Sequence, residues 1–161
     1  MTTETIALPR LTEVAPPGAA NGTLTLPFGD RRRSRLRARL DDGREVALLL
    51  PRGTELRDGD RLSDASGAFT VAVRAAEETL SWARAEDHLL LARAAYHLGN
   101  RHVPVQIGAG WLAYQHDHVL DGMIVEMGLA VETRRASFEP ESGGYRHGGG
   151  AAAHGGHHHE H

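Results

Sequence analysis

Two histidines separated by one residue, His116 and His118, are the sharpest candidate for chemistry in the sequence. They lie at a predicted junction between a strand and a helix. If the backbone is still extended there, both imidazoles point to the same side and can chelate one ion. In a helix they would diverge by about 200°. The alternative is that Asp117 only caps the helix and that both histidines are exposed surface residues.

His102 is a second candidate, between the predicted helix stop at Gly99-Asn100 and a predicted strand at Val103. One histidine makes a poor metal site, so the residues alone favour a structural histidine. If the protein were a symmetric dimer with this corner on its axis, two copies of His102 could share one ion.

Six of the 11 histidines follow Tyr145. These six are His147, His154, His157, His158, His159 and His161. Several imidazoles together favour borderline divalent ions, and nickel, copper and zinc all fit. The alternative is a purification tag, although Gly155-Gly156 and Glu160 interrupt the run in a way that a uniform engineered tag does not.

The chain contains no cysteine, which excludes disulfides, cysteine-type zinc sites, iron–sulfur clusters and thiolate copper sites. Its 161 residues can form one medium domain or two small ones. Residues 1–5 lack the basic and apolar regions of a signal peptide, and no apolar run approaches the roughly 20 residues that cross a bilayer. We therefore expect a cytoplasmic protein without a membrane partner.

Residues 1–75 have the patterns of a small β-sheet domain. Residues 34–40 alternate strictly between apolar and arginine side chains, which predicts a half-buried strand. Asp42-Gly43 is typical of a hairpin turn, and residues 44–50 form the predicted returning strand. Further strands are expected at residues 23–28 and 69–74.

Arginines gather near this first strand. They are Arg31, Arg32, Arg33, Arg35, Arg37 and Arg39. Aromatic residues for base stacking do not alternate with them, and the net charge is −3, so we expect no nucleic-acid partner. The arginines are interpreted as a solvated strand face or a protein-docking face.

Residues 76–141 change to an alternation of strands and helices. The expected elements are a strand at 79–83, a helix from Glu86-Asp87 to about Leu98, strands at 103–107 and 111–114, a helix at 118–127 and a strand at 129–138. The order βαββαβ is that of a ferredoxin-like domain. Residues 142–161 are rich in glycine and histidine and predict a disordered tail. The predicted fold class is therefore α+β.

Two segments resemble the signature of UreE urease accessory proteins. They are Ala95-Tyr96-His97-Leu98-Gly99-Asn100-Arg101-His102-Val103-Pro104-Val105-Gln106-Ile107 and Tyr114-Gln115-His116-Asp117-His118-Val119-Leu120. Phe138-Glu139-Pro140-Glu141-Ser142-Gly143-Gly144-Tyr145 continues the likeness into the histidine-rich end, and Leu50-Pro51-Arg52-Gly53 resembles the family's N-terminal domain.

The resemblance implies a non-enzymatic nickel metallochaperone. It implies a homodimer in which His102 binds nickel at the interface, His116 and His118 are peripheral ligands, and the tail histidines hold additional metal. It also implies the urease GTPase, the other urease accessory proteins and apo-urease as partners. Zinc or copper could occupy the same sites.

Two other functions compete with nickel delivery. A histidine-rich protein could store or buffer divalent metals without a urease client. A metal-dependent hydrolase is disfavoured, because no catalytic carboxylate accompanies a convergent triad of ligands.

Overall fold

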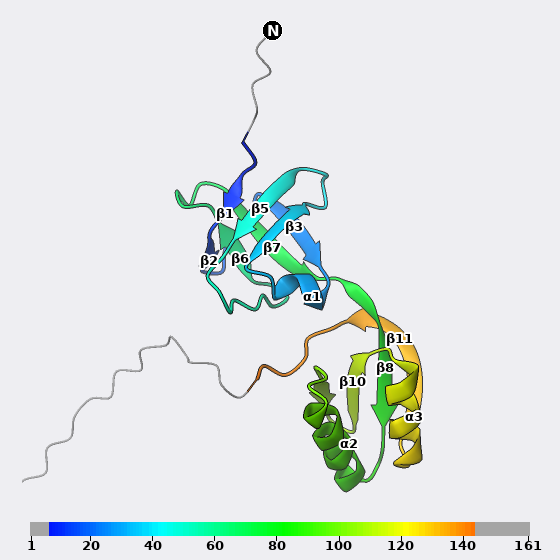
Figure 1. The fold of residues 1–161 in the computed structure, drawn as a ribbon. Helices are drawn as coiled ribbons and strands as arrows, with labels where there is room; N and C mark the ends of the chain where they lie inside the picture. The colour runs from blue at the N-terminus through cyan, green and yellow to red at the C-terminus, as the bar shows by residue number, and fades with distance from the viewer. Residues whose placement is uncertain (1–6, 144–161) are drawn as a thin grey trace, which may run out of the picture.

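The computed structural model describes residues 7–143. The first half contains seven strands and one short helix, and the second half contains four strands and two helices (Figure 1). The predicted α+β class is confirmed. The elements of the first half are β1 (Arg10–Leu11), β2 (Glu13–Ala15), β3 (Gly22–Leu26), α1 (Phe28–Arg31), β4 (Arg35–Arg39), β5 (Glu45–Leu49), β6 (Arg61–Ser63) and β7 (Thr70–Ala75).

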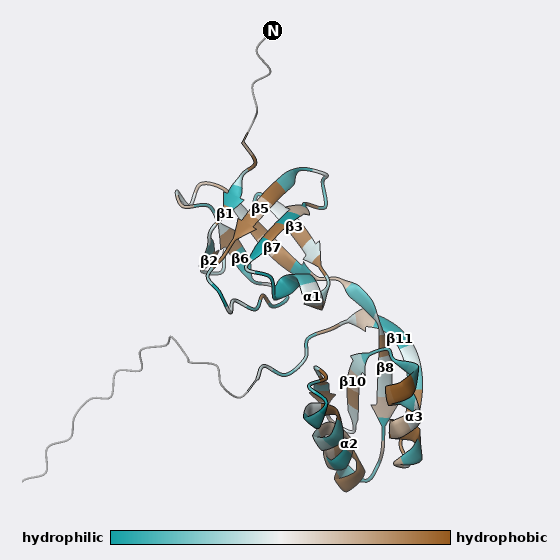
Figure 2. Ribbon diagram, viewed as in Figure 1, coloured by the Kyte–Doolittle hydropathy of each residue, from teal (hydrophilic) through white to brown (hydrophobic). Residues whose placement is uncertain are grey.

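Two sheets make up the first half. Their strand orders are β1-β5-β4 and β2-β6-β7-β3. The predicted hairpin is confirmed, because β4 pairs with β5 in antiparallel register from Arg35 opposite Leu49 to Arg39 opposite Glu45. Apolar side chains from both sheets form one buried cluster, and Figure 2 shows hydrophobic residues along β5 and β7.

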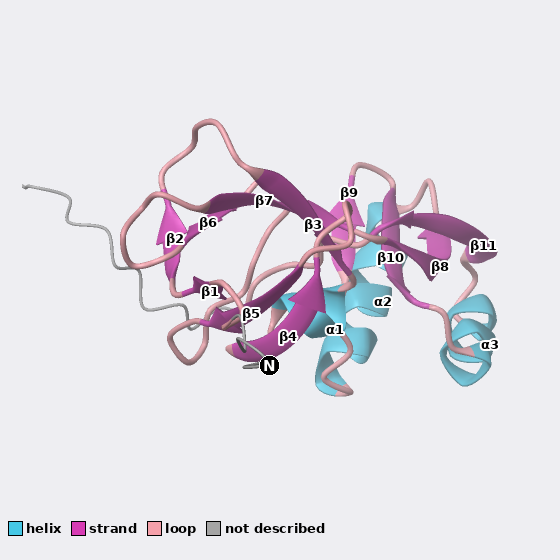
Figure 3. Ribbon diagram, turned by 90° about the horizontal axis from the view of Figure 1, so that it is seen from above, coloured by secondary structure: helices cyan, strands magenta, loops and turns pink. Residues whose placement is uncertain are grey.

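The second half has the predicted βαββαβ order. Its elements are β8 (Glu77–Arg84), α2 (His88–Asn100), β9 (Gln106–Gly108), β10 (Trp111–Gln115), α3 (His118–Glu126) and β11 (Ala130–Ser137). The strands form one antiparallel sheet in the order β11-β8-β10-β9. Both long helices lie on the same side of this sheet (Figure 3), and their apolar residues share a buried cluster with Ala83, Leu112 and Tyr114.

Side chains at the helix starts explain where these helices begin. Asp87 accepts a hydrogen bond from the backbone N–H of Leu89, and Asp117 accepts two, from Val119 and Leu120. Each is an N-cap that satisfies backbone donors which have no partner inside the helix, and such a cap stabilises the fold by about 1 kcal/mol.

The arginine cluster divides into two groups. Arg35, Arg37 and Arg39 lie exposed along β4, with Glu45 across the hairpin 2.8 Å from Arg37. Arg31 differs, because it has no exposed surface. The expectation of a solvated or docking face was therefore wrong for Arg31. Arg31 is the last residue of the short helix α1. The sequence pattern predicted a strand at residues 23–28 and did not predict this helix.

Arg31 joins the two halves of the chain. Its guanidinium donates to the carbonyl oxygens of Leu26, Leu56 and Phe138 and forms an ion pair of 2.5 Å with Glu139. Burying a charge is costly unless it is paired and hydrogen-bonded, and these contacts meet that need.

Residues 139–143, which follow β11, run between the two halves. Arg57 donates to the carbonyl oxygen of Pro140 at 2.7 Å and to the hydroxyl of Ser142 at 2.5 Å. On the other side, the N–H of Glu141 donates to the carbonyl oxygen of Val105 at 2.8 Å. This segment is therefore fixed to both halves before the chain reaches its histidine-rich end. Among the described residues, no helix is long and apolar enough to cross a membrane.

Candidate metal-binding site

His102 lies at the C-terminal end of α2, in the turn that stops the helix. Its N–H donates to the carbonyl oxygen of Gly99 at 2.9 Å, and the N–H of Val103 donates to that of Leu98 at 3.1 Å. These two bonds, with Leu98 and Val103 in one apolar cluster, form a Schellman motif. The expected stop at Gly99-Asn100 was early, because both residues remain in the helix.

The backbone of His102 is left-handed, with φ of 57°, and it is the one non-glycine residue with positive φ in the described part of the chain. This position of a Schellman motif is usually glycine, because a Cβ atom there approaches the following carbonyl oxygen. A histidine in this strained position indicates a function that requires its imidazole.

Replacing His102 by glycine is therefore expected to stabilise the fold. The free energy of unfolding should rise by about 1 kcal/mol, since glycine adopts the left-handed region without a Cβ clash. His97, exposed inside α2, provides the matched control. His97→Gly should lower the free energy by about 0.5 kcal/mol, because glycine is a poorer helix former. Urea unfolding measures both changes. If both substitutions changed the free energy of unfolding in the same direction, the strain at His102 would be contradicted.

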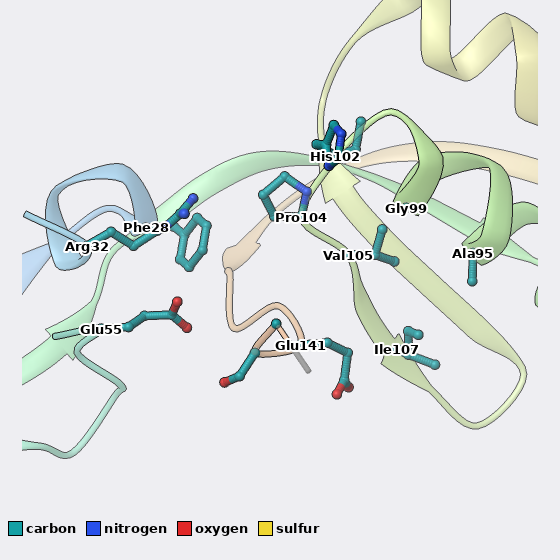
Figure 4. Close-up of a pocket in the computed structure, with 13 residues that line it drawn as sticks. Phe28, Arg32, Glu55, Ala95, Gly99, His102, Pro104, Val105, Ile107 and Glu141 are labelled. Atoms are coloured by element: carbon teal, nitrogen blue, oxygen red, sulfur yellow. The ribbon is translucent and has the colours of Figure 1, made fainter. Parts of the chain in front are cut away.

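A cavity of about 480 Å³ lies beside His102 (Figure 4). Its walls come from both halves of the chain: Phe28, Arg32 and Glu55 from the first, and Pro104, Val105 and Ile107 from the second. Glu141, Ser142 and Gly143 also line it. The last described residue therefore borders the same cavity as His102, whereas neither His116 nor His118 lines it.

His116 and His118 flank Asp117 at the junction of β10 and α3. His118 is the first helical residue, and Asp117 is extended, with φ of −150° and ψ of 120°. The N–H groups of Leu120 and Val119 hold the pKa of the Asp117 carboxyl below its ordinary value, because they stabilise its charged form. The predicted cap is confirmed, and both histidines are exposed.

His116 has partners that the sequence did not indicate. Its Nδ1 lies 3.1 Å from Oδ2 of Asp121 and 3.0 Å from Oγ of Ser81. The hydroxyl of Tyr114 donates to Oδ1 of Asp121 at 2.7 Å. Burial, followed by this hydrogen bond, raises the pKa of the Tyr114 hydroxyl well above its ordinary value, so the hydroxyl remains a donor.

The described residues bring no complete ligand set together. Within residues 7–143, no group of three or more histidine, aspartate or glutamate side chains is placed to hold one ion. The predicted tail ligands, from His147 to His161, lie outside the described residues.

Comparison with known proteins covers both halves of the chain. Residues 5–76 match the family described as UreE urease accessory protein, N-terminal domain, and residues 78–161 match the C-terminal domain of the same family.

Individual relatives agree with this match. The urease accessory protein UreE of Pseudomonas putida strain W619 is 59% identical over 125 residues, which cover 78% of each chain. The protein of the same name from Alkalilimnicola ehrlichii is 57% identical over 136 residues, 84% of this chain and 81% of the relative. That of Escherichia coli O157:H7 is 49% identical over 132 residues, 82% and 86% of the two chains.

The class of protein is therefore an α+β accessory protein that assists another protein's maturation and is not an enzyme. The chain belongs to the UreE urease accessory protein family. Its role lies in urease maturation, as the resemblance in the sequence implied.

Proposed function

We propose that the protein is a nickel-binding metallochaperone that donates nickel during assembly of the urease metallocentre. The observation that supports this best is the position of His102. Its imidazole is exposed, its backbone is left-handed, and it borders a cavity that is lined by residues of both halves of the chain. Imidazole is a ligand that nickel accepts, and a site with few protein ligands allows the ion to exchange. Onward transfer to a client needs such exchange.

The tight site is proposed to lie between two copies of the chain. One His102 supplies one ligand, and a two-fold axis at this corner brings a second His102 to the same ion. Exposed apolar side chains nearby fit an interface: Ile107, which lines the cavity, is 51% exposed, and Tyr96 on α2 is 66% exposed. The homodimer would then be held mainly by apolar contacts, with the ion shared at its centre.

His116 and His118 are proposed as weaker, peripheral nickel ligands, and the six tail histidines as additional ones. His147 follows the last described residue, Gly143, by four positions, and four residues span at most about 14 Å. The tail can therefore supply an imidazole close to the cavity that His102 borders. Zinc and copper suit the same donors.

The partners proposed for delivery are the urease GTPase, the other urease accessory proteins and apo-urease, all in the cytoplasm. We also propose that the chain is organised as domains 1–75 and 76–141 with a tail at 142–161. Nickel is the cargo of this system, and the protein performs no catalysis on it.

Delivery and storage differ in what limits urease activity. In cells that lack their own copy of the protein and grow on limiting nickel, delivery predicts that the chain restores urease activity with little change in total cell nickel. Storage predicts more cell nickel without a matching rise in urease activity. Measuring both quantities in the same cultures decides between the two functions.

Removing residues 146–161 is expected to lower the number of nickel ions bound and to leave a folded protein that still binds nickel tightly. The reason is that residues 146–161 consist of glycine, alanine, histidine, one arginine and one glutamate, without the large apolar side chains that build a core, and His102 lies in the described part of the chain. Calorimetric titration with nickel measures the outcome. Complete loss of binding would contradict the assignment of tight binding to His102.

A further inference from the structure

We propose that Asp121 is the positioning residue that prepares His116 to bind metal. This inference rests on the proposed peripheral role of His116. Asp121 would orient the His116 imidazole before an ion binds. Its neighbours Tyr114 and Ser81 lie, like Asp121, outside the expected ligand set.

The carboxylate of Asp121 determines which nitrogen of His116 carries the proton. Oδ2 of Asp121 lies 3.1 Å from Nδ1, and an ionised carboxylate has no proton to donate, so a lone pair on Nδ1 would face a negative oxygen and the form with the proton on Nδ1 is favoured. In a neutral imidazole the other nitrogen, Nε2, then has the free lone pair. The ring is thus held in the form that can bind a metal through Nε2.

Buried neighbours hold the carboxylate itself in place. Oδ1 of Asp121 accepts from the hydroxyl of Tyr114, a residue with no exposed surface. The Asp121 side chain is 20% exposed and that of His116 is 41% exposed, so the network runs from the core to the surface. Ser81 is fully buried on β8 and also contacts Nδ1. A hydroxyl both donates and accepts, so Ser81 alone does not select a tautomer.

His118 lacks an equivalent arrangement. Among the described residues, no hydrogen bond involves its side chain, which leaves its ring free to rotate at the start of α3. The pair therefore combines one oriented imidazole with one adaptable imidazole. A carboxylate–histidine–metal arrangement of this kind raises the basicity of the ligand, and losing the carboxylate typically weakens metal binding 10- to 100-fold.

The test uses the full chain with ¹⁵N-labelled histidine, first without metal. His116 is assigned by the loss of its signals in His116→Gln. In the unchanged protein, the ring-nitrogen shifts at pH 8 should report a proton on Nδ1 and a bare Nε2. In Asp121→Ala, this preference should be lost and both tautomers should appear. Asp121→Asn retains an acceptor oxygen and should restore much of the preference.

Glu126→Ala is the matched control, because it removes a carboxylate from an exposed position on the same helix. It should leave the His116 tautomer unchanged. An unperturbed tautomer in Asp121→Ala would overturn the inference, and so would a proton on Nε2 in the unchanged protein.

Nickel titration followed on the same His116 signals completes the test. Asp121→Ala should require about 10- to 100-fold more nickel to perturb them than Glu126→Ala does. Equal nickel requirements would overturn the positioning role. If nickel never perturbed His116 in the unchanged protein, the peripheral-ligand proposal would fail and the role of Asp121 in metal binding with it. The tautomer shifts would still report the effect of Asp121 on the imidazole.

Discussion

Replacing Arg31 by methionine is expected to lower the free energy of unfolding by about 3 kcal/mol. This is the largest loss of stability that we predict for a single substitution. The guanidinium is fully buried and is the donor to three carbonyl oxygens, those of Leu26, Leu56 and Phe138. Methionine fills similar space but donates to none of them. The carbonyl oxygen of Leu26 keeps the N–H of Ala76 as a donor, so the carbonyls of Leu56 and Phe138 are the two buried acceptors that lose their donor, and each such loss costs about 1 kcal/mol or more.

Glu139 limits the loss to this size. Its side chain is 29% exposed, so water can solvate part of the carboxylate after its partner is removed. Arg33→Met is the matched control, since Arg33 is 63% exposed and lies 3.6 Å from Asp30. An exposed pair of this kind contributes at most about 1 kcal/mol. Urea unfolding of the two variants should separate them clearly, and equal losses would mean that Arg31 does not join the halves of the chain.

The position of Arg31 also connects stability to the candidate site. Glu139, its ionic partner, begins the segment that reaches Glu141, Ser142 and Gly143 at the cavity of His102. Loss of the Arg31 contacts should therefore loosen one wall of that cavity. The two halves of the protein contribute to the surroundings of His102 together.

Replacing His102 by alanine is expected to abolish the tight nickel site while the protein remains folded. Alanine at this position retains a Cβ in a left-handed backbone, so it offers none of the stability that glycine should provide. Because two copies of His102 are proposed to share one ion, a single substitution removes both imidazoles at once. The proposed dimer should persist without metal, since the exposed apolar side chains of Ile107 and Tyr96, which are proposed to lie in its interface, are unchanged.

Much of the fold could be predicted from local patterns. The alternation in residues 34–40 predicted β4 correctly, because Leu36 and Ala38 on one face of the strand are partly buried against the core while the arginines on the other face are exposed. Asp117 was recognised as a cap because the chemistry of helix starts is local. Strands β1, β2 and β6 were not predicted, since two or three residues are too few to show a period.

The features that were missed depend on contacts between distant residues. Arg31 follows the same run as the exposed arginines, and only the approach of Phe138 and Glu139, more than 100 positions later, explains its burial. Ser81 reaches His116 across 35 positions. The strain at His102 was also invisible, because the helix continues through Gly99 and leaves the left-handed position to a histidine.

The most direct test of the central claim is the number of tightly bound nickel ions per dimer. Mass spectrometry under native conditions counts them for the unchanged chain and for His102→Ala, each equilibrated with a competing chelator that strips weak peripheral and tail sites. The double variant of His116 and His118 is the control and should retain the shared ion. We expect one nickel ion per dimer in the unchanged protein and none in His102→Ala, with both proteins dimeric. The same number of tightly bound ions in both would mean that His102 is only a structural histidine.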